Sequence, residues 1–233
     1  MPALLKRHPA WTIAAVAVAV LAIAVASLLA VREANANARL AEICSQIHSV
    51  SEHLDEAPIT EGDETVAVLG DSYSQGWSVG GPSEAWPATF GEQTDTAVYV
   101  DGFAGSGVTG STFCPEASFA ERVDEINRIE PDAVIIQAGL NDTTASSTRL
   151  REALAAVLDE IDADRVMVVG PPSPPARTAA ALQRVEEAFA KTAEDAGVQY
   201  VSLLDLELEY QDDKLHTDRD GQRIIGETIA AAW

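Results

Sequence analysis

Five apolar runs rich in valine and isoleucine recur along the chain from Thr65 onward, and segments with helical periodicity separate them. The runs cover residues 65–70 (TVAVLG), 97–101 (AVYVD), 132–139 (DAVIIQAG), 165–170 (RVMVVG) and 198–205 (VQYVSLLD). Continuous apolar runs of this length are typical of strands that are buried on both faces. The helical segments cover residues 148–162, 176–197 and 221–233. Alternating strands and helices predict an α/β domain whose parallel sheet is covered on both sides.

The N-terminal part of the chain has a different pattern, because residues 10–31 carry no charged side chain. A helix of this length spans about 33 Å, which is enough to cross a hydrocarbon core of about 30 Å. Lys6 and Arg7 precede it, so the positive-inside rule places residues 1–9 in the cytoplasm and the rest of the chain outside. The alternative is a cleaved signal peptide, because residues 34–38 (ANANA) fit a small-x-small cleavage pattern. We predict a single-pass membrane anchor, with secretion after cleavage as the alternative.

A second helix is predicted directly after the anchor. Apolar residues recur at helical spacing within residues 35–56, at Leu40, Ile43, Ile47, Val50 and Leu54. Residues 57–64 (APITEGDE) form a polar connector that contains proline and glycine. The expected organisation is a cytoplasmic N-terminus (1–9), a transmembrane anchor (10–31), a stalk helix with its connector (32–64), and one α/β domain (65–233).

The net charge and the cysteine content indicate which partners the chain can bind and whether it lies in an oxidising compartment. The net charge of −22 argues against a nucleic-acid partner, because binding to phosphates needs a basic surface. Metal-ligand spacing is absent among the many acids, so we expect no metal ion. Cys44 and Cys114 are the only cysteines, and a pair of this kind in an oxidising compartment often forms a disulfide. The alternative is that both remain unpaired as small apolar residues.

Candidate catalytic side chains follow the predicted strands. Ligands of an open parallel sheet bind beyond the carboxyl ends of the strands. Ser72 comes just after the first strand, Asn141 after the third, and Asp213 and His216 after the fifth with a longer gap. A serine hydroxyl needs a base to become a nucleophile, and His216 is the one histidine in the C-terminal part of the domain. Asp213, one helical turn earlier, can orient the imidazole of His216.

Acyl transfer also needs hydrogen-bond donors for the developing oxyanion. The backbone N–H of Ser72, a glycine N–H from the loop after the second strand, and the side-chain amide of Asn141 can supply them. The residues therefore describe a nucleophile, a base, an orienting acid and an oxyanion hole. Asp142 follows Asn141 and is expected to hold its loop or cap the next helix rather than to bind a metal.

Four blocks of this chain resemble those of the GDSL/SGNH hydrolase family, in the family's order and over residues 65–225. They are Gly70-Asp71-Ser72, a glycine in the second loop, Gly139-Leu140-Asn141-Asp142, and Asp213-x-x-His216. The resemblance implies a flavodoxin-like three-layer α/β/α sandwich with a five-stranded parallel sheet. It also implies ester hydrolysis through an acyl-serine without a cofactor. By that match Ser72 is the nucleophile, Asn141 an oxyanion donor, and Asp213 with His216 the remaining dyad.

The second block departs from the family pattern Asn-x-Gly-x-x-Gly. The residues here are Gly102-Phe103-Ala104-Gly105-Ser106-Gly107, which lack the asparagine and the first glycine. Gly107, followed by Val108 and Thr109, aligns best as the oxyanion glycine, and Gly105 is the alternative.

These observations together predict a membrane-anchored, extracytoplasmic serine esterase that cleaves carboxylic esters of a small molecule, a glycan or a lipid. One alternative is an O-acetyl transferase or deacetylase that acts on glycans of the cell envelope. A non-catalytic envelope protein that binds glycan or a partner is the second alternative.

Overall fold

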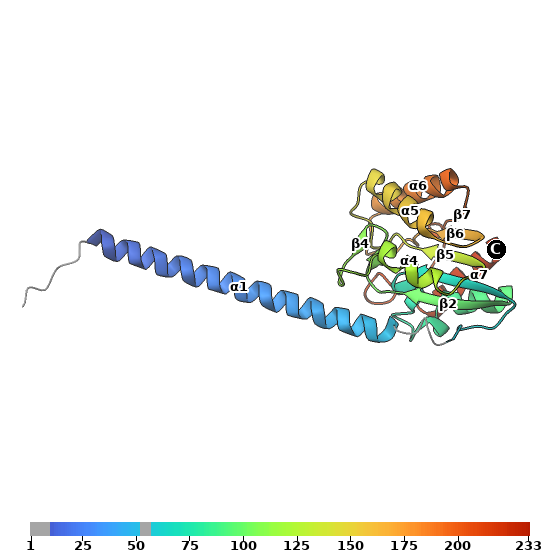
Figure 1. Cartoon of the computed structure of the whole chain (residues 1–233), viewed down its shortest axis with the longest axis horizontal. Helices are drawn as coiled ribbons and strands as arrows, with labels where there is room; N and C mark the ends of the chain where they lie inside the picture. Colours follow the sequence, from blue (N-terminus) through green and yellow to red (C-terminus); the bar gives the residue numbers. More distant parts are fainter. Residues whose placement is uncertain (1–9, 52–56) are drawn as a thin grey trace, which may run out of the picture. The chain divides into compact units, whose positions relative to one another are not determined.

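The computed structural model describes residues 10–51 and 57–233 (Figure 1). The chain divides into two compact units, Met1–Ile43 and Cys44–Trp233. The predicted cytoplasmic segment 1–9 and the last part of the predicted stalk helix, residues 52–56, lie outside the described residues. The boundary between anchor and stalk, at residues 31 and 32, stays a prediction.

The first element is α1 (Ala10–Ser51), a single helix of 42 residues that covers the predicted anchor and most of the predicted stalk. Its sequence contains no glycine or proline, so no residue interrupts the helical hydrogen bonds. Residues Ala14–Ser49 have the length and hydropathy of a membrane span, a property that signal sequences share. The large apolar side chains of Leu21 and Ile23 on this helix are each 65% exposed.

The second unit contains a five-stranded sheet in the order β2-β1-β5-β6-β7, and every pair in it is parallel. The strands are β1 (Glu64–Gly70), β2 (Thr96–Gly102), β5 (Ala133–Gln137), β6 (Arg165–Val169) and β7 (Gln199–Val201). They confirm the five predicted runs and the predicted parallel sheet. The last strand is shorter than its run, because the chain leaves the sheet after Val201 while Leu203 still packs in the core.

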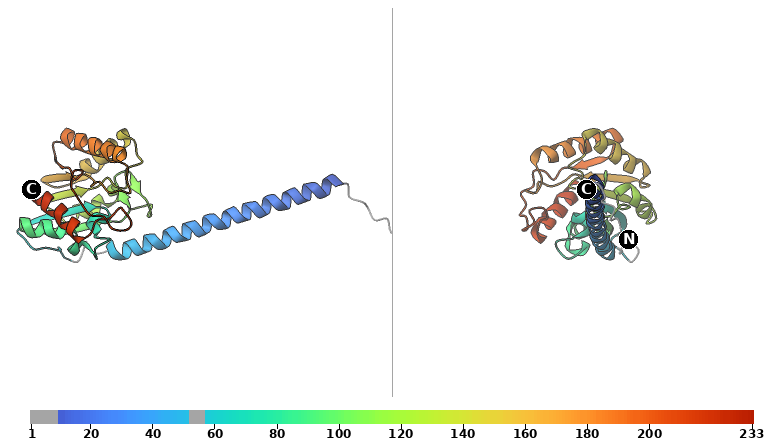
Figure 2. Two further views of the ribbon diagram at one scale, coloured as in Figure 1. Left: turned by 180° about the vertical axis from the view of Figure 1, so that it is seen from behind. Right: turned by 90° about the vertical axis from the view of Figure 1, so that its left-hand side faces the viewer.

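Helices cover both faces of this sheet, as Figures 1 and 2 show. The helices α3 (Trp86–Thr94) and α7 (Arg219–Ala232) pack on one face. The helices α4 (Phe119–Asn127), α5 (Ser147–Glu160) and α6 (Ala179–Ala196) pack on the other. The three-layer α/β/α sandwich is therefore confirmed.

Alternating residues of each strand supply two separate hydrophobic cores. In β1, Val66 and Val68 belong to the core under α3 and α7, whereas Ala67 and Leu69 belong to the core under α4, α5 and α6. All four are fully buried. The side chains of a strand alternate between its faces, so a strand that is apolar at every position can be covered on both sides.

The strand order also fixes where a ligand can bind. The chain passes from β1 to β2 on one side of β1, then returns to β5 on its other side, and continues outward to β6 and β7. The connections after β1 and β5 therefore lead in opposite directions. Such a reversal opens a crevice at the carboxyl ends of the two strands, and Ser72 and Asn141 follow those ends.

Cys44 and Cys114 are joined by a disulfide that spans 70 positions of sequence, so the predicted pairing is present. Both cysteines belong to the second unit. Ile47, Phe103, Ala104 and Ala117 form a small separate core around Cys114. The disulfide therefore attaches the last turns of α1 to the segment that follows β2.

Candidate active site

The nucleophile candidate stands at the first position of a very short helix, α2 (Ser72–Gln75). Asp71 caps this helix, because its Oδ1 accepts the N–H of Tyr73 at 2.9 Å. Gly76 ends the helix in the left-handed region at a φ of 68°. The preceding Gly70 leaves no room for a side chain, because a Cβ there would lie 2.0 Å from Ser74 Oγ. The tight turn holds Ser72 half-buried at the edge of the sheet.

Ser72, His216 and Asp213 form a continuous relay in the structure. Ser72 Oγ lies 2.9 Å from His216 Nε2, although 144 positions separate the residues in sequence. On the other side of the ring, His216 Nδ1 lies 2.6 Å from Asp213 Oδ2. The second oxygen, Asp213 Oδ1, accepts the backbone N–H groups of Leu215 and His216 at 2.9 Å each. Tyr73 fixes the same loop, because its hydroxyl donates to Leu215 O at 2.6 Å.

These contacts set the protonation of the relay. Burial acts to raise the pKa of Asp213, but hydrogen bonds from the His216 ring and from two backbone N–H groups outweigh it and bring the pKa to about 2. Asp213 is thus a carboxylate at neutral pH and holds the proton on His216 Nδ1. The lone pair of Nε2 is left facing the hydroxyl of Ser72, which is the arrangement that a general base needs.

The predicted oxyanion residues lie on two further loops. Gly107 belongs to β3 (Ser106–Gly107), which pairs with β4 (Gly110–Ser111). Asn141 follows β5, and its Nδ2 donates to Ser106 O at 2.8 Å, within the peptide group that carries the N–H of Gly107. Asn141 thus contacts the loop of Gly107 through the carbonyl oxygen of Ser106, whereas a Cβ on Gly105 would lie 2.6 Å from Phe113 Cδ2.

Asp142 holds a loop, as the sequence suggested, but the loop is that of Gly107 and not its own. Its carboxylate accepts the N–H of Thr109 at 2.8 Å, the hydroxyl of Thr109 at 2.7 Å and the N–H of Val108 at 3.3 Å. A Cβ on Gly107 would lie 2.7 Å from both carboxylate oxygens, so only glycine fits there. Burial raises the pKa of Asp142 in spite of these hydrogen bonds.

Residues 68–224 match the GDSL-like Lipase/Acylhydrolase family. The chain belongs to this family. Membership makes it an ester hydrolase of the serine type, and the matched segment covers all four blocks of the resemblance. No curated protein matches the chain in sequence.

Solved structures of other hydrolases share the fold of this GDSL-like hydrolase. A carbohydrate acetylesterase family member from Sinorhizobium meliloti superposes with a TM-score of 0.62 at 14% identity, covering 73% of this chain and 97% of that one. The M. smegmatis aryl esterase superposes with a TM-score of 0.61 at 16% identity, covering 73% and 98%. At these identities the likeness concerns the fold alone.

Two buried residues that sequence analysis missed lie next to the segments that carry Ser72 and Gly107 in the GDSL-like hydrolase. Arg122 and Asp101 form a buried ion pair, with side chains 8% and 5% exposed. A sequence signal for Arg122 was present, because it shares the apolar face of α4 with Phe119 and Ile126, three and four positions away. An arginine on an apolar helix face needs a buried partner, but the sequence does not reveal which acid supplies it.

Asp71, next to the nucleophile, is fully buried, and its carboxyl group loses its proton at a higher pH than an exposed aspartate does. Its burial raises the pKa from 3.8 to about 7, although the hydrogen bond from the Tyr73 N–H opposes the shift. The charge of Asp142 raises this pKa further. The Gln137 side chain and the charge of Arg122 act in the opposite direction. Asp71 therefore gains a charge near neutral pH inside the folded protein.

This late titration predicts that stability falls as the pH rises. Between about pH 4 and 7 the folded protein holds a proton on Asp71 that the unfolded chain has released, so the unfolding free energy falls by about 1.4 kcal/mol per pH unit from this group. The Asp71→Asn variant keeps an oxygen for the Tyr73 N–H and removes the titration. We expect its melting temperature to rise relative to wild type as the pH increases from 4 to 7. A difference that does not change with pH, like that expected for the exposed Asp124→Asn, would contradict the assignment.

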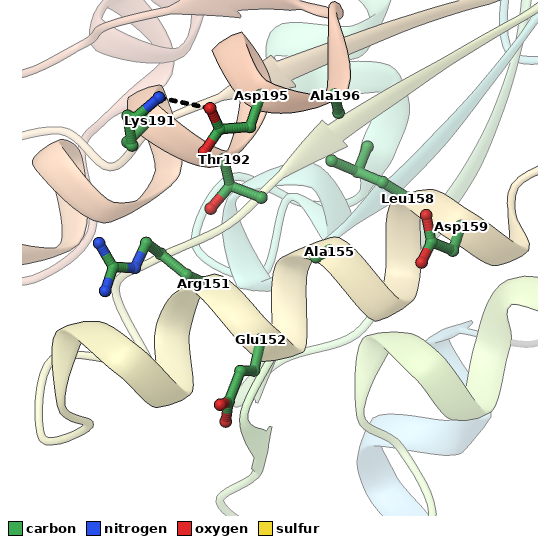
Figure 3. A pocket seen from close by; sticks show the side chains of 9 residues that line it. All are labelled: Arg151, Glu152, Ala155, Leu158, Asp159, Lys191, Thr192, Asp195 and Ala196. Atoms are coloured by element: carbon green, nitrogen blue, oxygen red, sulfur yellow. Dashed lines mark hydrogen bonds and ion pairs between the residues drawn. The ribbon is translucent and has the colours of Figure 1, made fainter.

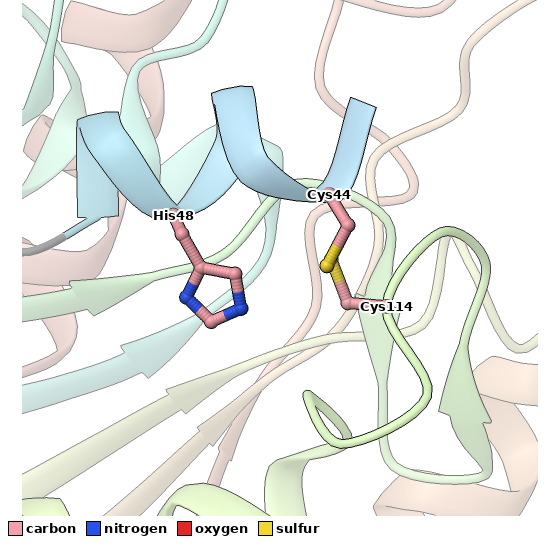
Figure 4. Close-up of side chains that lie close together, drawn as sticks. All are labelled: Cys44, His48 and Cys114. Atoms are coloured by element: carbon pink, nitrogen blue, oxygen red, sulfur yellow. A yellow bond between two sulfur atoms is a disulfide. The ribbon is translucent and has the colours of Figure 1, made fainter. Parts of the chain in front are cut away.

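Cys44, His48 and Cys114 lie together and resemble a metal-ligand group (Figure 4). The two sulfur atoms are bonded to each other, so the closed disulfide leaves His48 as the one free donor. The His48 ring packs edge-on against Phe103, with ring centroids 5.0 Å apart. This group therefore acts as a structural contact of the GDSL-like hydrolase.

A shallow pocket of about 460 Å³ lies between α5 and α6 (Figure 3). Leu158 and Ala155 line it, with charged side chains around them. Lys191 is occupied by ion pairs with Glu194 and Asp195 of its own helix. None of the relay or oxyanion residues lines this pocket, so it is separate from the site at the edge of the sheet.

Proposed function

We propose that Ser72, His216 and Asp213 catalyse the hydrolysis of carboxylic esters, with Ser72 N–H, Gly107 N–H and the Asn141 amide as the oxyanion hole. The observation that carries this proposal is the continuous relay from Asp213 through His216 to Ser72, with separations of 2.6 and 2.9 Å. These distances are within the range in which a base accepts a proton from a nucleophile.

The reaction proceeds in two halves. Ser72 Oγ attacks the carbonyl carbon of the ester while its proton passes to His216 Nε2, and the Asp213 carboxylate stabilises the imidazolium. The negative charge that develops on the carbonyl oxygen is stabilised by the three oxyanion donors. Nε2 then gives its proton to the departing alcohol oxygen, which leaves an acyl group on Ser72. A water molecule, deprotonated by Nε2, attacks this acyl group, and the proton returns to Ser72 Oγ as the carboxylic acid leaves.

The direct test is covalent labelling of the full chain in detergent. A fluorophosphonate probe is expected to label one residue per chain, identified as Ser72 by mass spectrometry, and to abolish hydrolysis of p-nitrophenyl acetate in proportion. Exposed Ser202 provides an internal comparison, because it has no neighbouring base among its hydrogen-bond partners. Absence of labelling at Ser72 would favour a non-catalytic envelope-binding protein.

Activity is expected to fall as the pH is lowered, because His216 has to be neutral to act as the base. Protonated His216 cannot accept the serine proton, so kcat/KM falls tenfold per pH unit once the imidazole is protonated. Asp213, with its pKa at about 2, stays charged throughout this range. Asp71, beside the nucleophile, has its pKa at about 7, so the Asp71→Asn variant is measured alongside to remove the contribution of that carboxyl to the profile. A profile of kcat/KM against pH measures this limb. A flat profile between about pH 5 and 8 is incompatible with His216 as the base.

We further propose that the enzyme is anchored in the membrane by α1 and acts on the extracytoplasmic side. The apolar Ala14–Ser49 segment, the basic residues before it and the Cys44–Cys114 disulfide support this location. Secretion after cleavage is the alternative. Protease treatment of intact cells separates cytoplasmic from external exposure, and the apparent mass of the mature chain reports cleavage.

The substrates that fit this location are esters of small molecules, glycans or lipids. One of the structural neighbours is named as a carbohydrate acetylesterase, which supports acetylated glycans of the envelope as a specific candidate. Transfer of the acetyl group to a sugar is the alternative outcome of the same acyl-serine. Release of free acetate from an acetylated glycan indicates hydrolysis, whereas an acetylated acceptor sugar indicates transfer.

A further inference from the structure

Arg122 stands out because nothing in the hydrolytic mechanism uses it, although it is a buried cation close to the nucleophile. It projects from α4, and its side chain is only 8% exposed. The rings of Phe119 and Phe103 flank its guanidinium at 5.1 and 5.7 Å from their centroids. Aromatic faces at these distances favour a cation and keep water away from it. A buried arginine is costly unless its donors are satisfied, so its hydrogen bonds indicate its role.

The guanidinium reaches three separate segments of the chain. Nη1 donates to Asp101 O at 3.0 Å and to Asp101 Oδ1 at 2.5 Å, near the end of β2. Nη2 donates to Gly70 O at 2.9 Å, at the end of β1. The same Nη2 donates to Ser106 Oγ at 2.9 Å, at the start of β3. One nitrogen atom therefore joins the segments of Gly70 and Ser106.

These two acceptors precede the two backbone donors of the proposed oxyanion hole. Gly70 stands two positions before Ser72, and Ser106 stands one position before Gly107. The N–H groups of Ser72 and Gly107 come from segments 35 positions apart, yet both have to lie about 3 Å from the same oxygen atom. A displacement of about 1 Å in such a group can cost about 100-fold in rate.

The charge and shape of arginine suit this task. The Asp101 carboxylate, 5% exposed, holds the guanidinium in place and balances its charge. The planar fork presents several N–H donors at fixed angles, whereas a lysine ammonium has no such fork. We propose that Arg122 is a positioning residue that sets the spacing between the Ser72 and Gly107 N–H donors without touching the substrate. This inference rests on the proposed function of Ser72 and Gly107.

The test compares Arg122→Lys with wild type in the full chain in detergent. Lysine keeps a positive charge beside Asp101 and removes the fork. We expect kcat for p-nitrophenyl acetate, counted per serine labelled by a fluorophosphonate, to fall about 10- to 100-fold while KM changes less than threefold. Arg149→Lys is the matched control, because Arg149 Nη2 donates to Thr109 O on the same loop but does not reach β1, and its kcat per labelled serine is expected to stay within twofold.

Counting per labelled serine separates positioning from folding. A merely structural role lowers the fraction of chains that label but leaves kcat per labelled serine unchanged, and that result would overturn the inference. If Arg122→Lys does not fold, Asp101→Asn and Ser106→Ala decide together. Asp101→Asn removes the carboxylate that holds the guanidinium and leaves both bonds of Ser106 Oγ in place, whereas Ser106→Ala removes the acceptor of Nη2 together with the donor to Ala117 O. A fall of about threefold or more in kcat per labelled serine for both variants supports positioning, and an unchanged value for Asp101→Asn overturns it. Wild-type protein that does not label at Ser72 shows instead that the proposed function has failed.

Discussion

The Ser72→Ala variant is expected to hydrolyse p-nitrophenyl acetate with a kcat about 10⁵-fold below that of the wild type. The substitution removes the atom that carries the acyl group, so the two-step route through an acyl-serine is closed. His216 can still deprotonate a water molecule, and the oxyanion donors remain, which leaves a small residual rate above the uncatalysed reaction. The measurement is steady-state kinetics on the full chain in detergent, with a melting curve to show that the fold is intact.

Companion variants test whether the three residues act as a unit. Ser72→Ala combined with His216→Gln is expected to cost little more than Ser72→Ala alone, because either change already breaks proton transfer. Asp213→Asn is expected to lower kcat by about 10⁴-fold, since an amide no longer fixes the proton on Nδ1 of His216. Ser202→Ala, at an exposed serine after β7, serves as the control and retains full activity. Retention of more than a tenth of the wild-type kcat by Ser72→Ala would exclude the acyl-serine route.

Most of the sheet could be predicted from the sequence because its strands are buried on both faces. Within the run 132–139, residues 133–136 (AVII) are all apolar, so no position there could face water. A central parallel strand was therefore the natural interpretation, and β5 (Ala133–Gln137) confirms it. The short helix α4 was missed. It has only nine residues, and acids make up much of its exposed side, so its periodicity is visible mainly through Phe119, Val123 and Ile126.

Those residues of the candidate site that follow the end of a strand could be predicted, because parallel strands bring their carboxyl ends to one edge of the sheet. Ser72, Asn141 and His216 were found in this way. The Asp101–Arg122 pair could not be found, because it joins a strand to a helix on the basis of side-chain reach that no local pattern encodes. The hydrogen bond from Asn141 to Ser106 O is likewise a contact between loops, set by their packing.

Reduction of the Cys44–Cys114 disulfide is expected to lower the free energy of unfolding of the Cys44–Trp233 unit by about 4 kcal/mol. The bond closes a loop of 70 positions, and in the chain-entropy account a loop of that size restricts the unfolded chain by about 4 kcal/mol. For a unit of this size the loss corresponds to a fall in melting temperature of roughly 10 °C. Melting curves of the full chain in detergent, recorded with and without a dithiol reductant, measure it.

Reduction of the disulfide should disturb the active site at temperatures below global unfolding, because the disulfide belongs to the small core that supports the oxyanion loop. Cys114 packs with Phe103 and Ala117, and Ser106 Oγ donates to Ala117 O at 2.5 Å, one residue before Gly107. Esterase activity is therefore expected to disappear at a lower temperature in the reduced protein. A Cys44→Ser, Cys114→Ser double variant should match the reduced wild type and show no response to the reductant. Equal melting curves for the oxidised and reduced wild type would mean that the bond does not restrict the unfolded chain. Detection of two free thiols in protein purified without reductant would remove the disulfide as support for an extracytoplasmic location.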